Sequence, residues 1–367
     1  MFLINKDRFL KFKVLKYFVS KDWYPFIEAD IIYKEGISKS RKLITDLDVI
    51  AFFPSPFGKL VPIIGDCKTL KNQSPISRAL WMRGLMDLLG AHQGLVVLEK
   101  SIENDHKLAA NQLSVNLISG RDFDIYTKCT SEKYRDINSA LCIEEHWSKY
   151  FAIPTRFPML KPALEYTKRE FWNEKGANIR LRHILALIKN IKSELNPDNQ
   201  EHIALFLDLV SFFAIAINEI VYSIFNQYLI PSTKEQLSEE LKVLIWGGIE
   251  NYSYWDELRK MILTQNNITV TSDLSLPEWN RFLQLIRGFL EEPYATTLSP
   301  LLLKEVAFEY FADKTVLGSL NNARRLAKSN PQSSKFAILT AEYICKASKA
   351  PPEFLDIVRD RIVKLQL

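Results

Sequence analysis

The order of apolar and polar positions in the first part of the chain predicts one helix followed by three strands. Residues 5–20 place apolar side chains at helical spacing, with lysines on the opposite face. Apolar and β-branched residues then alternate or run together over residues 26–33, 42–53 and 60–68, which is typical of strands. The connections between these strands are short, so we expect an antiparallel meander.

The pattern then changes to helices that alternate with short strands. Ser74 and Pro75 are typical of a helix start and Gly90 of a helix end, which predicts a helix over residues 74–91. A strand, a helix, a strand and a helix are expected next, at residues 94–100, 103–113, 114–119 and 120–126. The resulting order, α-β-β-β-α-β-α-β, favours an α/β domain with a mixed sheet and helices on both faces.

Beyond residue 128 the strand pattern nearly disappears and helical periodicity replaces it. Helices are expected at residues 178–194, 200–228, 234–248, 276–291, 299–312, 318–329, 334–348 and 352–366. Residues 268–276 can be read as a strand or as a loop. We therefore expect an α/β domain over residues 1–127 and a mostly α-helical domain, or two subdomains, over residues 128–367, with the boundary between 128 and 160.

Residues 203–225 are apolar enough to raise the question of a membrane span, which needs about 20 residues. Asp208, Asn218 and Glu219 interrupt this segment, and charges at membrane depth are costly, so a buried helix is favoured over a membrane-associated effector. The cysteines form no CxxC pair, which argues against a zinc site. The N-terminus lacks the apolar core of a signal peptide, and we expect a cytoplasmic protein without a membrane partner.

The composition, with 47% hydrophobic and 25% charged residues, is that of a globular protein. The net charge is only +5, and residues 1–127 supply most of it, with 18 Lys and Arg against 14 Asp and Glu. Lys11 and Lys13 lie in the basic first helix, which could neutralise nucleic-acid phosphates. A solvated helix face is the alternative interpretation of these lysines.

Acidic and basic side chains come together at two expected strand ends. Asp46 and Asp48 share one face of the second strand, and Asp66 and Lys68 share one face of the third. If these strands pair, Asp48 comes close to Asp66, and two adjacent carboxylates repel each other unless a cation lies between them. Mg²⁺, or Mn²⁺ in its place, suits such oxygen donors. Lys68 could then position or deprotonate an attacking water, or stabilise charge on a phosphate.

These strands also resemble a known family. The segments "DLDVIAF" and "IIGDCKT" are similar to the metal-binding strands of the PD-(D/E)xK nuclease superfamily. Residues 106–123, "HKLAANQLSVNLISGRDF", look like the helix, strand and helix that close the cores of Mrr-like restriction endonucleases. The resemblance covers residues 5–127 and implies a restriction-endonuclease-like fold with an α-β-β-β-α-β core.

The resemblance implies roles for individual residues. Asp48, Asp66 and the backbone carbonyl of Cys67 would bind the metal ion, and Lys68 would be the catalytic lysine. Glu28 would be an accessory acid, although it lies on the first strand and not on the first helix, and Asp46 is a rival to Asp48.

Arg78, on the helix after the third strand, would contact the scissile phosphate, with a surface arginine as the alternative. Its neighbour Trp81 is interpreted first as a core residue and second as a platform on which a base could stack.

We therefore predict a Mg²⁺-dependent nuclease that acts on DNA, without excluding RNA, and that serves as the effector subunit of a restriction or phage-defence system. The helical domain would bind a protein partner or form a homo-oligomer. The alternative is a catalytically inactive module of the same fold that binds nucleic acid or acts as a scaffold.

Overall fold

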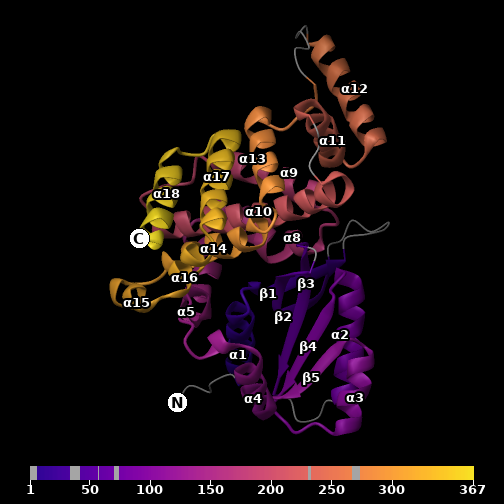
Figure 1. Cartoon of the computed structure of the whole chain (residues 1–367), viewed down its shortest axis with the longest axis vertical. Coiled ribbons are helices and arrows are strands. Elements are labelled where there is room, and N and C mark those ends of the chain that lie inside the picture. The colour runs from indigo at the N-terminus through magenta and orange to yellow at the C-terminus, as the bar shows by residue number, and fades with distance from the viewer. Residues whose placement is uncertain (1–5, 34–41, 57, 70–73, 230–232, 267–272) are drawn as a thin grey trace. The chain divides into compact units, whose positions relative to one another are not determined.

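The computed structural model describes residues 6–33, 42–56, 58–69, 74–229, 233–266 and 273–367. Its N-terminal part is built on a five-stranded mixed sheet in the order β1-β2-β3-β4-β5 (Figure 1). The antiparallel strands β1 to β3 are followed by β4 and β5, which run parallel to β3. The strands are β1 (Tyr24–Tyr33), β2 (Lys42–Pro54), β3 (Leu60–Lys68), β4 (Gln93–Leu98) and β5 (Val115–Ser119).

Helices cover both faces of this sheet (Figure 1). Helices α1 (Lys6–Ser20) and α4 (Gly120–Thr130) pack on one face, and α2 (Pro75–Leu89) and α3 (Asn104–Gln112) pack on the other. The inner side of α1 buries Leu10, Val14 and Phe18, as its apolar periodicity predicts. The expected mixed sheet with helices on both faces is therefore confirmed.

The rest of the described chain is mostly helical, which is also as expected. Short helices come first: α5 (Glu144–Phe151), α6 (Ile153–Arg156), α7 (Lys161–Glu165) and α8 (Phe171–Asn173). The longer ones are α9 (Ala177–Ile191), α10 (Gln200–Tyr228), α11 (Lys234–Trp246), α12 (Ile249–Gln265), α13 (Trp279–Glu291), α14 (Ala295–Glu309), α15 (Lys314–Ser319), α16 (Asn322–Ser329), α17 (Pro331–Ser348) and α18 (Glu353–Gln366). Most of the strand proposed for residues 268–276 lies outside the described residues, and residues 273–276 are not extended strand.

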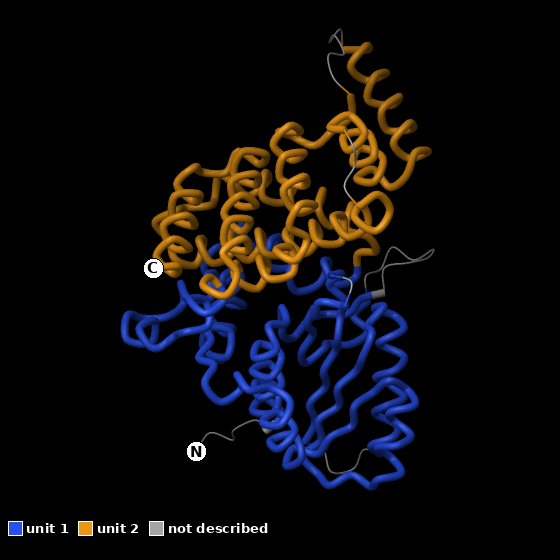
Figure 2. Tube along the Cα trace, viewed as in Figure 1, with its two compact units in different colours: residues 1–173, 304–326 blue, residues 174–303, 327–367 orange. Residues whose placement is uncertain are grey.

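The chain divides into two compact units, and the division does not follow the sequence in a simple way (Figure 2). The first unit joins Met1–Asn173 to the distant segment Lys304–Leu326, and the second joins Glu174–Leu303 to Ala327–Leu367. The first unit extends past residue 127 because the β1 residue Phe26 packs against the Trp147 and Trp172 rings, with centroids 5.4 and 5.3 Å away.

Helix α10 is the core helix of the second unit, where it contacts α9, α13 and α17. It is the one helix among the described residues that is long and apolar enough for a membrane span. However, 94% of its most apolar window is buried inside the protein. This agrees with the buried helix that the interrupting polar residues predict.

Candidate active site

Strands β2 and β3 pair along only part of their length and separate beyond Val49 and Gly65. We call this point the fork, and Asp48 and Asp66 lie at it. Strand β2 pairs with β1 from Lys42 to Phe52, but its pairing with β3 ends at Val49 and Gly65. Beyond that point β3 pairs only with β4 along residues 66–68. Asp48 and Asp66 are the first residues beyond the last paired residues, Val49 and Gly65. Their side chains therefore lie where β2 and β3 no longer form backbone hydrogen bonds with each other.

The Asp48 carboxylate connects β2 to β3 at the fork through a hydrogen bond. Its Oδ2 accepts a hydrogen bond from the Cys67 backbone N–H at 2.8 Å, in place of a strand-to-strand bond. The Lys68 ammonium lies 3.2 Å from the same oxygen, and the Lys11 ammonium lies 3.2 Å from Oδ1. Burial raises the pKa of Asp48, but these two ammonium groups and the Cys67 N–H outweigh burial and lower it below its ordinary value. Asp48 is therefore held as a carboxylate.

Asp66 is the most buried acid of the site, with 3% of its side chain exposed. Arg78, in the first turn of α2, donates to both of its oxygens, with Nε 2.6 Å from Oδ2 and Nη2 2.5 Å from Oδ1. The Lys68 ammonium lies 3.6 Å from Oδ1. Burial raises the pKa of Asp66, and Arg78 and Lys68 oppose this rise.

Lys68 lies between the two aspartates and stays protonated there. Burial lowers its pKa, but the carboxylates of Asp48 and Asp66 outweigh burial, and the net pKa is raised. Of the roles considered for this lysine, stabilising negative charge fits this environment and deprotonating a water does not.

Glu28 joins the same cluster from β1. It lies between Ile27, which pairs with Val49, and Ala29, which pairs with Leu47, so it is directly opposite Asp48. Its φ of 54° is in the left-handed region, which is unusual for a non-glycine residue inside a strand. The Lys11 ammonium lies 3.1 Å from its Oε1 and so bridges Glu28 and Asp48.

The remaining predicted residues divide into those that reach the cluster and those that do not. Lys11, predicted as a phosphate contact, is buried beside the acids. Lys13 instead pairs with Asp124 at 2.6 Å on the other side of α1. Asp46, the rival of Asp48, is solvent-exposed and has no ion pair in the described part of the chain.

The Cys67 carbonyl, which the resemblance implies as a metal ligand, lies on the side of β3 that faces Asp48. In a β-strand the N–H and C=O of one residue point to the same side. Because the Cys67 N–H points to Asp48, its carbonyl also faces the fork. The Cys67 thiol is fully buried, and burial raises its pKa well above the ordinary value, so the thiol is protonated in this environment.

One contributor was missed from the sequence. The Asp7 carboxylate accepts a hydrogen bond from the Thr69 backbone N–H, 2.5 Å away, and so fixes the chain just after Lys68. In the sequence Asp7 stands out only as the single acid of a basic helix, and its role depends on how α1 packs on the sheet.

The donors at the fork fit a hard divalent ion in their chemistry. Asp48, Asp66 and the Cys67 carbonyl offer oxygen, which Mg²⁺ and Mn²⁺ prefer. Within the described residues no group of three or more His, Cys, Asp or Glu side chains is arranged to hold a metal, so backbone and water would complete the coordination.

The cluster is electrically balanced without an ion. The carboxylates of Asp48, Asp66 and Glu28 are matched by the cations of Lys11, Lys68 and Arg78, all within 3.6 Å of a partner. A divalent ion would therefore have to displace at least one cationic side chain from its carboxylate.

Comparisons with known proteins give no relative against which to test this site. No protein-family model, no curated protein and no solved structure matches the chain.

Proposed function

We propose that the chain is a metal-dependent nuclease that hydrolyses phosphodiester bonds, with DNA as its substrate. The observation that carries the proposal is the meeting of Asp48, Asp66 and Lys68 at the fork between β2 and β3, with Lys68 within 3.2 and 3.6 Å of the two acids. Buried acids whose pKa values are shifted by burial and by a shared cation are candidates for a catalytic centre.

Each side chain has a role that its geometry supports. Asp48, Asp66 and the Cys67 carbonyl would hold Mg²⁺ or Mn²⁺, which when bound supplies positive charge at the scissile phosphate. The Lys68 ammonium, kept protonated by both acids, would stabilise the charge that grows on the phosphate oxygens. Arg78 would donate to a phosphate oxygen, since its guanidinium matches phosphate as well as carboxylate.

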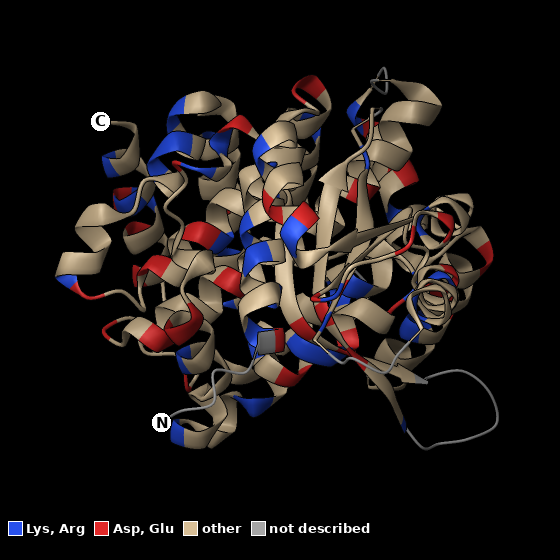
Figure 3. Ribbon diagram, turned by 90° about the horizontal axis from the view of Figure 1, so that it is seen from below, with Lys and Arg blue, Asp and Glu red and all other residues tan. Residues whose placement is uncertain are grey.

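Binding of the substrate would depend on this local cluster more than on a broad basic surface. Basic and acidic residues are interspersed over the elements seen in Figure 3. Lys13, which the sequence suggested as a phosphate contact, is already paired with Asp124.

The charge balance of the site favours a second candidate function. Because three cations already neutralise the three acids, the same cluster could serve as a structural ion-pair network in an inactive nuclease-fold module. Such a module would bind nucleic acid or a partner protein without cutting.

The discriminating experiment is a cleavage assay with the purified protein. Supercoiled plasmid, linear duplex, single-stranded DNA and RNA are each incubated with Mg²⁺, with Mn²⁺ and with EDTA. We expect cleavage only with a divalent ion, and a loss of about 10²-fold or more in rate for Asp66→Asn and for Lys68→Ala.

Asp46→Asn is the matched control, because Asp46 is an exposed acid two residues from Asp48 on the same strand face. It should cut at the wild-type rate. Unchanged cleavage in Lys68→Ala, or cleavage in EDTA, would exclude this mechanism, and activity on RNA alone would correct the substrate.

A further inference from the structure

Arg78 uses both oxygens of the most buried acid in the candidate site. The two contacts, of 2.6 and 2.5 Å, form a bidentate pair, and the Asp66 side chain is 3% exposed. Asp48 differs, because its partners are the point charges of Lys11 and Lys68 and a backbone N–H. Asp66 is thus the acid whose two oxygens are held by a single side chain, Arg78.

The pairing with Arg78 occupies lone pairs of Asp66 that a metal ion could otherwise use. A carboxylate that accepts two guanidinium bonds presents those lone pairs to the arginine and not to an ion on the same side. A divalent ion placed beside the guanidinium would also be repelled by it, and this repulsion is strong in a buried site. Ion binding through the lone pairs that face Arg78 therefore requires that Arg78 move.

Arg78 has an alternative partner in a substrate phosphate. A guanidinium binds phosphate in the same two-bonded geometry that it uses for a carboxylate. Its Cζ lies 3.6 Å from the centroid of the Trp81 ring, which is three residues further along α2 and shares its helix face. The flat indole can support the guanidinium in more than one position, so Arg78 can exchange one anion for the other without losing this contact.

We propose that the Arg78–Asp66 pair is a latch that couples substrate binding to metal binding. In the free protein Arg78 holds Asp66, and the ion binds weakly. A phosphodiester draws Arg78 away, and Asp66 then becomes available to the ion. This inference rests on the proposed nuclease function, and it adds that phosphate and metal each raise the affinity for the other, as linkage requires.

The test measures Mn²⁺ binding directly and not through activity. Free Mn²⁺ is counted by electron paramagnetic resonance while the ion is titrated into the protein, with and without a short phosphorothioate DNA duplex that resists cleavage. We expect the duplex to tighten Mn²⁺ binding to the wild-type protein by about tenfold or more.

Arg78→Gln removes the guanidinium and should bind Mn²⁺ tightly even without the duplex, with less than about a twofold further gain when it is added. Arg78→Lys keeps the charge but cannot pair in two bonds, and it should bind more tightly than wild type without the duplex. If Arg78→Gln fails to fold, Arg78→Lys alone provides the test. Arg83→Gln is the matched control, because Arg83 lies on the same helix but pairs with the exposed Asp87; it should behave as wild type.

The outcomes separate the latch from the proposed function. If wild type binds Mn²⁺ equally well with and without the duplex, or if neither Arg78 variant binds it better than wild type, the latch is refuted while the nuclease stands. If no Mn²⁺ binds to wild type or to either Arg78 variant under any condition, both proposals are overturned.

Discussion

Glu28 has the most unusual backbone near the candidate site. A non-glycine residue with a φ of 54° pays about 1–2 kcal/mol relative to the ordinary conformations of a strand. In return its carboxylate reaches the Lys11 ammonium, which also contacts Asp48. Strained residues of this kind gather at functional sites, where the surrounding structure holds them in place.

The strain can be measured by comparing two substitutions that both remove the carboxylate. In a strand interior, alanine is normally more stable than glycine by about 0.5–1 kcal/mol. At Glu28 the order should be reversed, with Glu28→Gly more stable than Glu28→Ala by about 1 kcal/mol, because only glycine adopts this φ freely. Urea denaturation of both variants gives the difference. An alanine variant as stable as the glycine variant would show that the residue is not left-handed.

At the same scale, the sequence predicts some site residues and misses others. Strand periodicity and the short turn bring Asp48, Asp66 and Lys68 together, because side-chain alternation and antiparallel pairing are local rules. The burial of Lys11 beside the acids and the bond from Thr69 to Asp7 depend on where α1 packs on the sheet, which no local pattern determines.

The position of α1 depends on a glycine at the fork. A Cβ on Gly65 would lie 3.2 Å from Val14 Cγ1, so α1 approaches β3 more closely than a larger residue would allow. Lys11 lies one turn before Val14 on the same helix face. The close approach at Gly65 thus lies one helical turn from Lys11, whose ammonium is 3.2 Å from Asp48 Oδ1.

Enlarging Gly65 should push this helix away. We expect Gly65→Val to lower the free energy of unfolding by about 1–3 kcal/mol through overpacking. Gly84→Ala is the control, because a Cβ on Gly84, within α2, would meet no atom within 4 Å. It should raise the free energy of unfolding by about 0.5–1 kcal/mol. Chemical denaturation measures both, and equal stability of Gly65→Val and wild type would contradict the packing argument.

Element positions show where sequence patterns are reliable. The expected strands at residues 42–53 and 60–68 match β2 and β3 closely, since their apolar runs end at clear turns. Helix α12 (Ile249–Gln265) was not predicted, because most of its large apolar residues are exposed and do not form a buried stripe. Short helices between residues 131 and 173 were missed for a different reason: each is too short to show a period.

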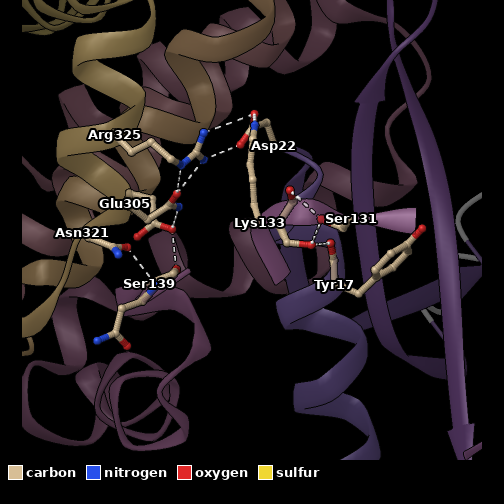
Figure 4. A network of polar contacts seen from close by, with 11 residues as sticks. Tyr17, Asp22, Ser131, Lys133, Ser139, Glu305, Asn321 and Arg325 are labelled. Atoms are coloured by element: carbon tan, nitrogen blue, oxygen red, sulfur yellow. Dashed lines mark hydrogen bonds and ion pairs between the residues drawn. The ribbon is translucent and has the colours of Figure 1, made fainter. Parts of the chain in front are cut away.

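At the scale of the molecule, the first unit is completed by a segment from far along the chain. Glu305 accepts hydrogen bonds from Ser139 and Asn322 (Figure 4). Arg325 pairs with Asp22, the second residue after the end of α1, and Lys133 pairs with the same acid. These contacts join residues up to 303 positions apart, so the sequence could not place Lys304–Leu326 in the unit that carries the candidate site.

Glu305 makes the stability of the protein depend on pH in a predictable direction. Burial raises its pKa from 4.5 to about 7, although the donors Ser139 and Asn322 oppose the rise, and the nearby Glu309 adds to it. The native state therefore holds a proton between pH 4.5 and 7 that the unfolded chain has released. The contribution of Glu305 to the free energy of unfolding is greatest below the unfolded pKa of 4.5 and is lost as pH rises toward the folded pKa of about 7.

Glu305→Gln should remove this dependence, because the amide oxygen can accept the same two hydrogen bonds and carries no charge. Relative to wild type, the variant should gain about 2–3 kcal/mol in unfolding free energy between pH 5 and pH 8. Urea denaturation at both pH values measures the gain. The control Glu132→Gln, at an exposed site, should differ from wild type equally at both pH values. A pH-independent difference between Glu305→Gln and wild type would mean that Glu305 ionises at its ordinary pKa. The contacts of the segment Lys304–Leu326 would then be made by a charged carboxylate and not by a protonated one.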